Sequence, residues 1–136
     1  MNKEIEEKFV KTFVDKQMHD RLLFELFHKN LEKREHAISR FEHGAVKYLK
    51  RNYIHLADNK ITIDVVEKEI RKIQPSTNEC YIIGTTYDGK KMQFKKALEI
   101  TFDWLGGAIL IISDNVAFIK KEQSYGAPMK YILYKS

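Results

Sequence analysis

The sequence predicts an α+β fold in which an N-terminal helical segment packs on a mainly antiparallel sheet. Apolar residues recur at helical spacing through the first half of the chain, and short β-branched runs bounded by turn residues fill the second half. Helices followed by strands are typical of this class. We expect about three to four helices, then four to five strands with one inserted helix. The chain of 136 residues is expected to form one domain, helical over about 1–74 and sheet-rich over about 79–136.

The composition is that of a globular protein. Hydrophobic residues make up 43% of the chain and charged residues 32%, which excludes the disordered class. A single cysteine, Cys80, rules out a disulfide within the chain. The N-terminus is charged where a secretory signal would be apolar, and the longest apolar run is too interrupted to span a bilayer. We therefore expect a soluble cytoplasmic protein that does not bind membranes.

Two helices are expected at the N-terminus. Asn2 is a suitable cap, and Ile5, Phe9 and Phe13 fall on one face of a helix that runs to roughly Lys16. Asp20 offers a second cap before the run 21–27. This run is apolar on more than one face, so it predicts a buried helix. The two segments are compatible with one bent rod or with two separate helices.

A third helix is predicted from Leu31 to about Arg51. Its expected core stripe follows the i, i+3, i+7 pattern and comprises Ile38, Phe41, Ala45, Tyr48 and Leu49. Residues 54–60 form a connector or a short strand. Asp64 begins a capping box, which predicts a short amphipathic helix that ends before Pro75.

The second half of the chain predicts the sheet. A strand begins at Cys80, and Asp88-Gly89 indicates a type I′ turn to a partner strand. A helix is expected from Lys95 to Leu105, with Gly106-Gly107 at its C-terminal cap. The apolar run 108–119, broken by a Ser-Asp-Asn turn, predicts a hairpin at the centre of the sheet, covered on both faces. A last strand is expected at 129–134, where Lys130 and Lys135 suit a sheet edge.

The familiar catalytic motifs are absent from the sequence. It contains no Gly-x-Ser-x-Gly, no phosphate-binding loop that ends in Lys-Ser or Lys-Thr, and no His-Glu-x-x-His. Cys80 begins a strand without a basic neighbour in sequence, so a small buried hydrophobe is the expected role. We expect no catalytic residue and no cofactor, and a binding protein rather than an enzyme.

All five histidines lie between residues 19 and 55. Two of them, His36 and His43, follow Glu35 and Glu42 in a near-repeat with a spacing of seven. On a helix this spacing puts the two imidazoles about 10.5 Å apart along the axis, too far for one metal whose bonds to nitrogen are about 2.1 Å. No metal site is expected, and one would need His28 or residues from another helix. A solvated or interfacial helix face is the expected role.

Positive charge is concentrated in the third helix. Residues 27–51 hold seven basic and three acidic residues, whereas residues 1–26 hold five and six. Basic residues with interleaved aromatics suit phosphate contacts and base stacking, although a solvated basic face has the same pattern. The candidate binding residues on this helix are Arg34, His36, Arg40, His43 and Lys47.

Absent catalytic motifs and an aromatic content of 12% favour a small non-enzymatic binding or regulatory module. We expect it to act through contacts with an unidentified protein partner, or with its own copy as a homo-oligomer. Exposed tyrosines on and before the last strand, Tyr125, Tyr131 and Tyr134, are expected to form a contact patch. Glu122 and Tyr125 are compatible with the lining of a groove, although a polar loop is the expected role. The alternative is a nucleic-acid-binding protein that uses the basic helix at about 33–51.

Overall fold

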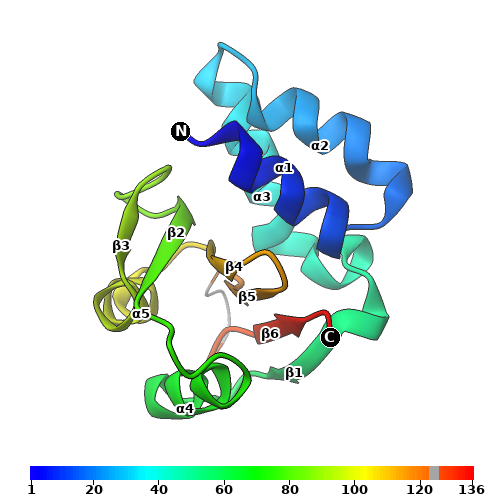
Figure 1. The fold of residues 1–136 in the computed structure, drawn as a ribbon. Helices are drawn as coiled ribbons and strands as arrows, with labels where there is room; N and C mark the ends of the chain where they lie inside the picture. Colours follow the sequence, from blue (N-terminus) through cyan, green and yellow to red (C-terminus); the bar gives the residue numbers. More distant parts are fainter. Residues whose placement is uncertain (123–125) are drawn as a thin grey trace.

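A six-stranded antiparallel sheet lies between helices that cover both of its faces (Figure 1). This computed structural model describes residues 1–122 and 126–136, without the side chain of Val46. The helices are mostly N-terminal, as predicted, and the α+β class is confirmed. The described sheet exceeds the expected four to five strands because residues 54–58 form a strand and not a connector.

The helices begin where the sequence supplies capping side chains. Asn2 accepts a hydrogen bond from the Ile5 amide at 3.1 Å, and Asn30 accepts one from the Glu32 amide at 3.0 Å. Thr62 caps the fourth helix in place of the predicted Asp64, because its hydroxyl reaches the Val65 amide. The α-helices of the described residues are α1 (Lys3–Phe13), α2 (His19–Leu26), α3 (Leu31–Tyr48), α4 (Ile63–Ile73) and α5 (Phe94–Asp103).

The predicted hairpin is confirmed at the centre of the sheet. Its strands are β4 (Ala108–Ser113) and β5 (Val116–Lys120), and the sheet order is β1-β6-β5-β4-β2-β3. The other strands are β1 (Ile54–Asp58), β2 (Glu79–Gly84), β3 (Lys91–Gln93) and β6 (Lys130–Tyr134). The expected edge position of the last strand is wrong, since β6 pairs with β1 on one side and β5 on the other.

Alternation along the central strands divides the core into two layers. Ile109 and Ile111 of β4 face the cluster formed with α1, α2 and α3, whereas Leu110 and Ile112 face the cluster formed with α4 and α5. Both faces of the hairpin are therefore buried, as its apolar sequence predicts. The layer of α1, α2 and α3 is gathered on one side of the sheet in Figure 1.

The Gly106-Gly107 pair does not cap α5. The helix ends at Asp103, and the amide of the next residue, Trp104, donates to the Ile100 and Thr101 carbonyls. The buried Lys120 ammonium then donates to the Trp104 and Gly106 carbonyls. Gly107 instead makes room for α3, because a Cβ there would lie 2.3 Å from the Glu42 Cγ. The glycine is required by a close approach between two elements rather than by a helix end.

Two other local predictions change in the structure. The helix α2 is not buried all round: Leu22 and Leu26 are in the core, but Phe24 is 62% exposed. A short 3₁₀ turn, Lys16–Met18, separates α2 from α1, so the two are distinct helices. The connection from β2 to β3 is longer than the predicted two-residue turn, because the Asp88 carboxylate is held by Arg34 and by the Gly84 amide.

Candidate functional site

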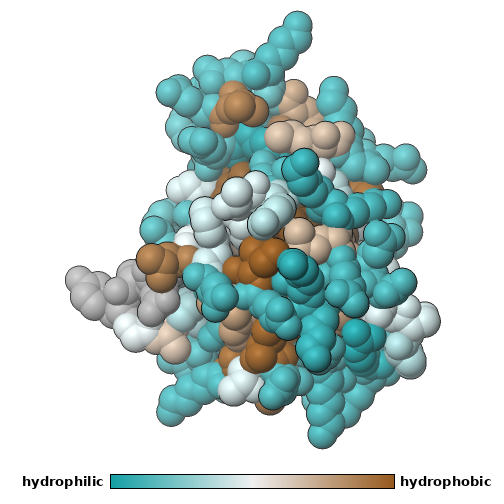
Figure 2. All heavy atoms as spheres, turned by 90° about the vertical axis from the view of Figure 1, so that its left-hand side faces the viewer, coloured by the Kyte–Doolittle hydropathy of each residue, from teal (hydrophilic) through white to brown (hydrophobic). Residues whose placement is uncertain are grey.

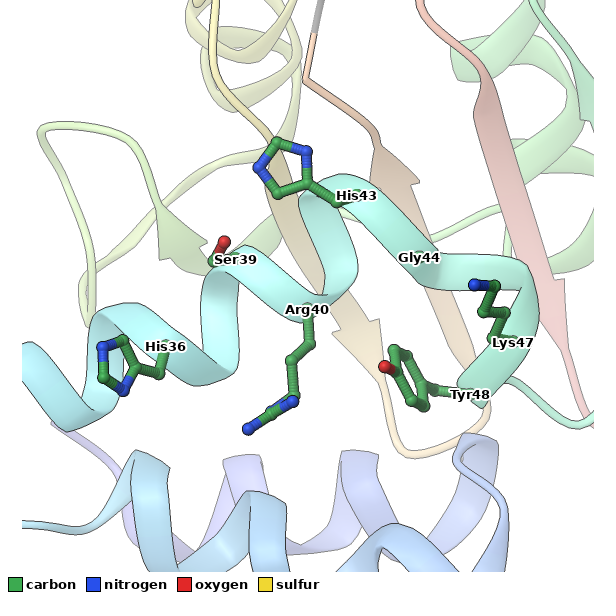
Figure 3. A pocket seen from close by; sticks show the side chains of 7 residues that line it. All are labelled: His36, Ser39, Arg40, His43, Gly44, Lys47 and Tyr48. Carbon is green, nitrogen blue, oxygen red and sulfur yellow. The ribbon is translucent and has the colours of Figure 1, made fainter.

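One face of α3 lines a shallow hollow of about 440 Å³ (Figure 3). Its lining residues repeat at the spacing of helical turns, so they form a single stripe. We call them the α3 stripe: His36, Ser39, Arg40, His43, Gly44, Lys47 and Tyr48. The stripe brings together four of the eight residues that the sequence singled out, namely His36, Arg40, His43 and Lys47.

The charge of the α3 stripe is positive. None of the described side chains that line the hollow is acidic. Lys47 and His43 are exposed, the His43 side chain by 64%. Within the described residues, Lys47 has no carboxylate within 4.0 Å. The stripe therefore presents cationic and imidazole groups to solvent.

Arg40 lies at the border between α3 and α2. Its Nε and Nη2 atoms donate to the two Glu25 carboxylate oxygens at 2.9 and 3.0 Å. The hydrogen bond from Arg40 holds the pKa of Glu25 below its ordinary value. Figure 3 shows Arg40 and Tyr48 on the side of α3 that faces the N-terminal helices, whereas His43 points away from them. Arg40 is thus part of the hollow and also joins two helices.

A second hollow of about 350 Å³ adjoins the stripe at His43. Its lining includes Glu42, His43 and Glu122. His43 Nε2 lies 3.1 Å from Glu122 Oε2. Burial, followed by the charge of Glu122, raises the pKa of Glu42. This hollow joins the helical layer to the end of β5, which the sequence spacing of these residues does not reveal.

Arg34 does not belong to the exposed basic face that the sequence predicts. Its side chain is 2% exposed and donates to the carboxylates of Glu6 and Asp88 and to the Leu26 carbonyl. The Tyr81 hydroxyl donates to Glu6 as well. Because these partners lie on α1, α2 and the β2–β3 connection, Arg34 points into the fold and not toward solvent. The prediction that Arg34 contributes to an exposed binding face is wrong, because its side chain is buried.

The expected tyrosine patch is not formed by the last strand. Tyr131 is 2% exposed and lies in the core beneath α1, α2 and α3, so its expected exposure is wrong. Its burial follows from the position of β6 inside the sheet. Tyr134 is partly buried and packs edge-on against His55. Tyr125 lies outside the residues that the structure describes.

An apolar hollow at the end of α2 was not anticipated. It is lined by Leu23, Phe24, Phe27, His28 and Lys29. The signal was present in the sequence, since Leu22 and Leu26 are four residues apart and Phe24 lies on another face. Figure 2 shows one face of the molecule, on which apolar residues form separate patches among hydrophilic ones.

Comparison with protein-family models, with curated proteins and with solved structures gave no match. Across residues 1–122 and 126–136, none of the helices combines the length and apolar content that a membrane crossing requires. The two hollows along α3 are the places where the described residues offer a binding surface.

Proposed function

We propose that this protein is a non-enzymatic cytoplasmic binding module that docks an acidic segment of a partner protein on the α3 stripe. The observation that supports this proposal is the lining of the hollow, which combines cationic and imidazole side chains with no acidic one among its described residues. Complementary charge at an interface attracts a partner and selects against basic surfaces. An extended acidic segment matches a stripe that follows three turns of one helix.

The residues of the α3 stripe contribute differently to this contact. Lys47 is exposed, and its long side chain can reach a carboxylate at the rim. Arg40 is paired with Glu25, so its guanidinium shapes the floor of the hollow and the binding charge comes mainly from Lys47. Ser39 and Tyr48 add hydroxyl groups that can donate to carboxylate oxygens.

The nucleic-acid alternative receives less support. The candidate residues on α3 include three lysines or arginines. Two of them are engaged within the protein, because Arg34 is buried in ion pairs and Arg40 is paired with Glu25. Binding to a phosphate backbone depends on several exposed lysines or arginines. Lys47 remains as the exposed cation of that set, which is why a protein partner is the preferred proposal.

Charge reversal of Lys47 tests the proposal. Fluorescence anisotropy would measure the binding of a labelled oligoglutamate peptide and of a labelled single-stranded oligonucleotide. We expect Lys47→Glu to weaken oligoglutamate binding by about fivefold or more, the loss of an attraction of ~1 kcal/mol. The matched control is Lys68→Glu, which makes the same charge change at an exposed position on α4.

Equal losses in the two variants, or no binding by the wild-type protein, would refute the proposal. Tighter binding of the oligonucleotide than of the peptide would favour the alternative. Light scattering of the unliganded protein tests self-association. A dimer that Lys47→Glu dissociates, and Lys68→Glu does not, would identify the acidic segment as part of a second copy.

A further inference from the structure

Two segments that are far apart in sequence bring three potential metal ligands together. Glu42 and His43 lie on α3, and Glu122 follows the last residues of β5. One ligand atom from each of these three side chains lies within 4.8 Å of the others. The backbone fixes this approach as well, because the Glu122 amide donates to the Glu42 carbonyl at 3.3 Å.

The chemistry of the three side chains suits a divalent transition metal. Zinc bonds to imidazole nitrogen and carboxylate oxygen at about 2.0–2.2 Å, so two ligands of one ion lie roughly 3–4 Å apart. The separation of 3.1 Å between His43 Nε2 and Glu122 Oε2 falls in this range. An imidazole in the set favours zinc over the hard cations magnesium and calcium, which prefer oxygen ligands.

Glu42 is held in place by the surrounding structure. It is partly buried, and its side chain packs against the Gly107 backbone. A side chain at residue 107 would occupy the same space, since a Cβ there lies 2.3 Å from Glu42 Cγ. Two carboxylates held this close repel each other, and a divalent cation between them removes that repulsion.

We propose that Glu42, His43 and Glu122 bind one divalent transition-metal ion, for which Zn²⁺ is the probe. Three protein ligands leave at least one coordination position open toward the adjoining hollow of about 350 Å³. The rest of that hollow is lined by Asn59, Lys121, Ala127, Pro128 and Met129. The α3 backbone leaves helical geometry at Gly44, directly after the second ligand. This site is independent of the acidic-segment proposal, although it shares His43 with the α3 stripe.

The chain contains its own control for this site. Glu35 and His36 repeat the Glu-His pair one heptad earlier on the same helix. Both side chains are exposed, and among the described residues no third ligand completes a cluster around them. The Glu35-His36 pair and the Glu42-His43 pair therefore have the same two side chains. Only the second pair also has the carboxylate of Glu122 nearby.

Isothermal titration of the full, tag-free chain with zinc chloride tests the proposal. We expect one Zn²⁺ per chain, and an affinity that falls by about tenfold or more in Glu122→Gln and in His43→Ala. His36→Ala and Glu35→Gln should bind as the wild type does. Glu122 is 40% exposed, so Glu122→Gln should keep the fold, which far-ultraviolet circular dichroism would verify.

Three results would overturn the proposal: no saturable zinc binding, unchanged affinity in Glu122→Gln, or an equal loss in His36→Ala. An imidazole resonance assigned to His43 should shift on zinc addition, while that of His36 should not. Lys47→Glu should leave zinc binding intact, and Glu122→Gln should leave oligoglutamate binding intact. The two proposals can therefore fail separately.

Discussion

Arg40 and Lys47 carry the same charge on the same face of α3, but their surroundings give them different roles. The Arg40 guanidinium is committed to the two oxygens of Glu25, whereas the Lys47 ammonium is exposed. A bidentate arginine–carboxylate pair has a fixed geometry and joins α2 to α3. Its contribution should therefore be seen in stability, and that of Lys47 in binding.

Replacement of Glu25 by Gln should lower stability in a pH-dependent way. The hydrogen bond from Arg40 lowers the pKa of Glu25 in the folded state. Its contribution is therefore complete above the unfolded-state pKa of about 4.3 and is lost as pH falls through the lower folded-state pKa. In urea unfolding, Glu25→Gln should lower the free energy of unfolding by ~1–3 kcal/mol at about pH 7. This difference from the wild type should shrink toward about pH 3.

Glu7→Gln is the control for this measurement. The Glu7 carboxylate pairs with Lys11 at the exposed surface of α1, so its removal should cost less than ~0.5 kcal/mol. If the loss of unfolding free energy in Glu25→Gln stayed constant as the pH was lowered, the ion pair with Arg40 would not be the cause of that loss.

Single residues could be predicted from sequence when their environment is local. The burial of Cys80 is confirmed, and that burial raises the pKa of its thiol to about 12, so it stays protonated at neutral pH. The burial of Arg34 could not be predicted, because Glu6 and Asp88 lie 28 and 54 residues away in the chain. The cluster of Glu42 and His43 with Glu122 depends on long-range contact in the same way.

At the scale of elements, close backbone approaches position the strands next to α3. Gly84 ends β2 with φ at +93°, and a Cβ there would lie 2.9 Å from the Gly107 carbonyl oxygen. That neighbour is backbone and cannot rotate aside. The end of β2 and the start of β4 are thus in contact at a place where a side chain does not fit.

Gly84→Ala should destabilise the protein by ~2–4 kcal/mol, because it combines a positive φ with a backbone clash. Gly126→Ala is the matched control: φ is +63°, but among the described residues, chain neighbours aside, an added Cβ would meet no heavy atom within 4 Å. Gly126→Ala should lower the free energy of unfolding by ~1 kcal/mol, because of the positive φ alone. Urea unfolding of both variants measures the difference, and equal costs would show that the clash is relieved by small shifts.

Elements were predictable where their signals are local, and their order in the sheet was not. The apolar run 108–119 with its polar break indicated the central hairpin, and Asn2 indicated the start of α1. The strand order depends on which distant segments meet. An edge position for the last strand was inferred from Lys130, but this ammonium is buried and donates to the Asn59 and Pro128 carbonyls instead.

At the scale of the molecule, a buried polar cluster joins the helical layer to the sheet. Arg34 of α3 bonds Glu6 of α1 and Asp88 of the β2–β3 connection, and Tyr81 of β2 donates to Glu6. Burial, followed by the hydrogen bond to Glu6, raises the pKa of Tyr81, so its hydroxyl remains a donor at neutral pH. The cluster therefore adds directional hydrogen bonds to the apolar packing between the helical layer and the sheet.

Arg34→Met should destabilise the whole fold by ~3–5 kcal/mol, because it leaves two carboxylates without their buried partner. Lys33→Met, at the preceding and partly exposed position, should change stability by less than ~0.5 kcal/mol. Asp88→Asn gives a graded test, since the Asp88 side chain is 25% exposed and its loss should cost less than that of Arg34. Urea unfolding measures all three, and equal stability of Arg34→Met and Lys33→Met would contradict the expectation.

The pairing of β1 with β6 has a consequence for how the chain reaches this structure. Ile54 of β1 lies beside Leu133 of β6, so β1 can pair with β6 only after β6 has been synthesised. The apolar faces of α1, α2 and α3 also wait for the strands that cover them. Contacts of such long sequence separation slow folding and leave apolar surface exposed meanwhile. During translation β1 therefore lacks its strand partner until β6 is made, and the apolar faces of the helices lack their cover until the strands follow.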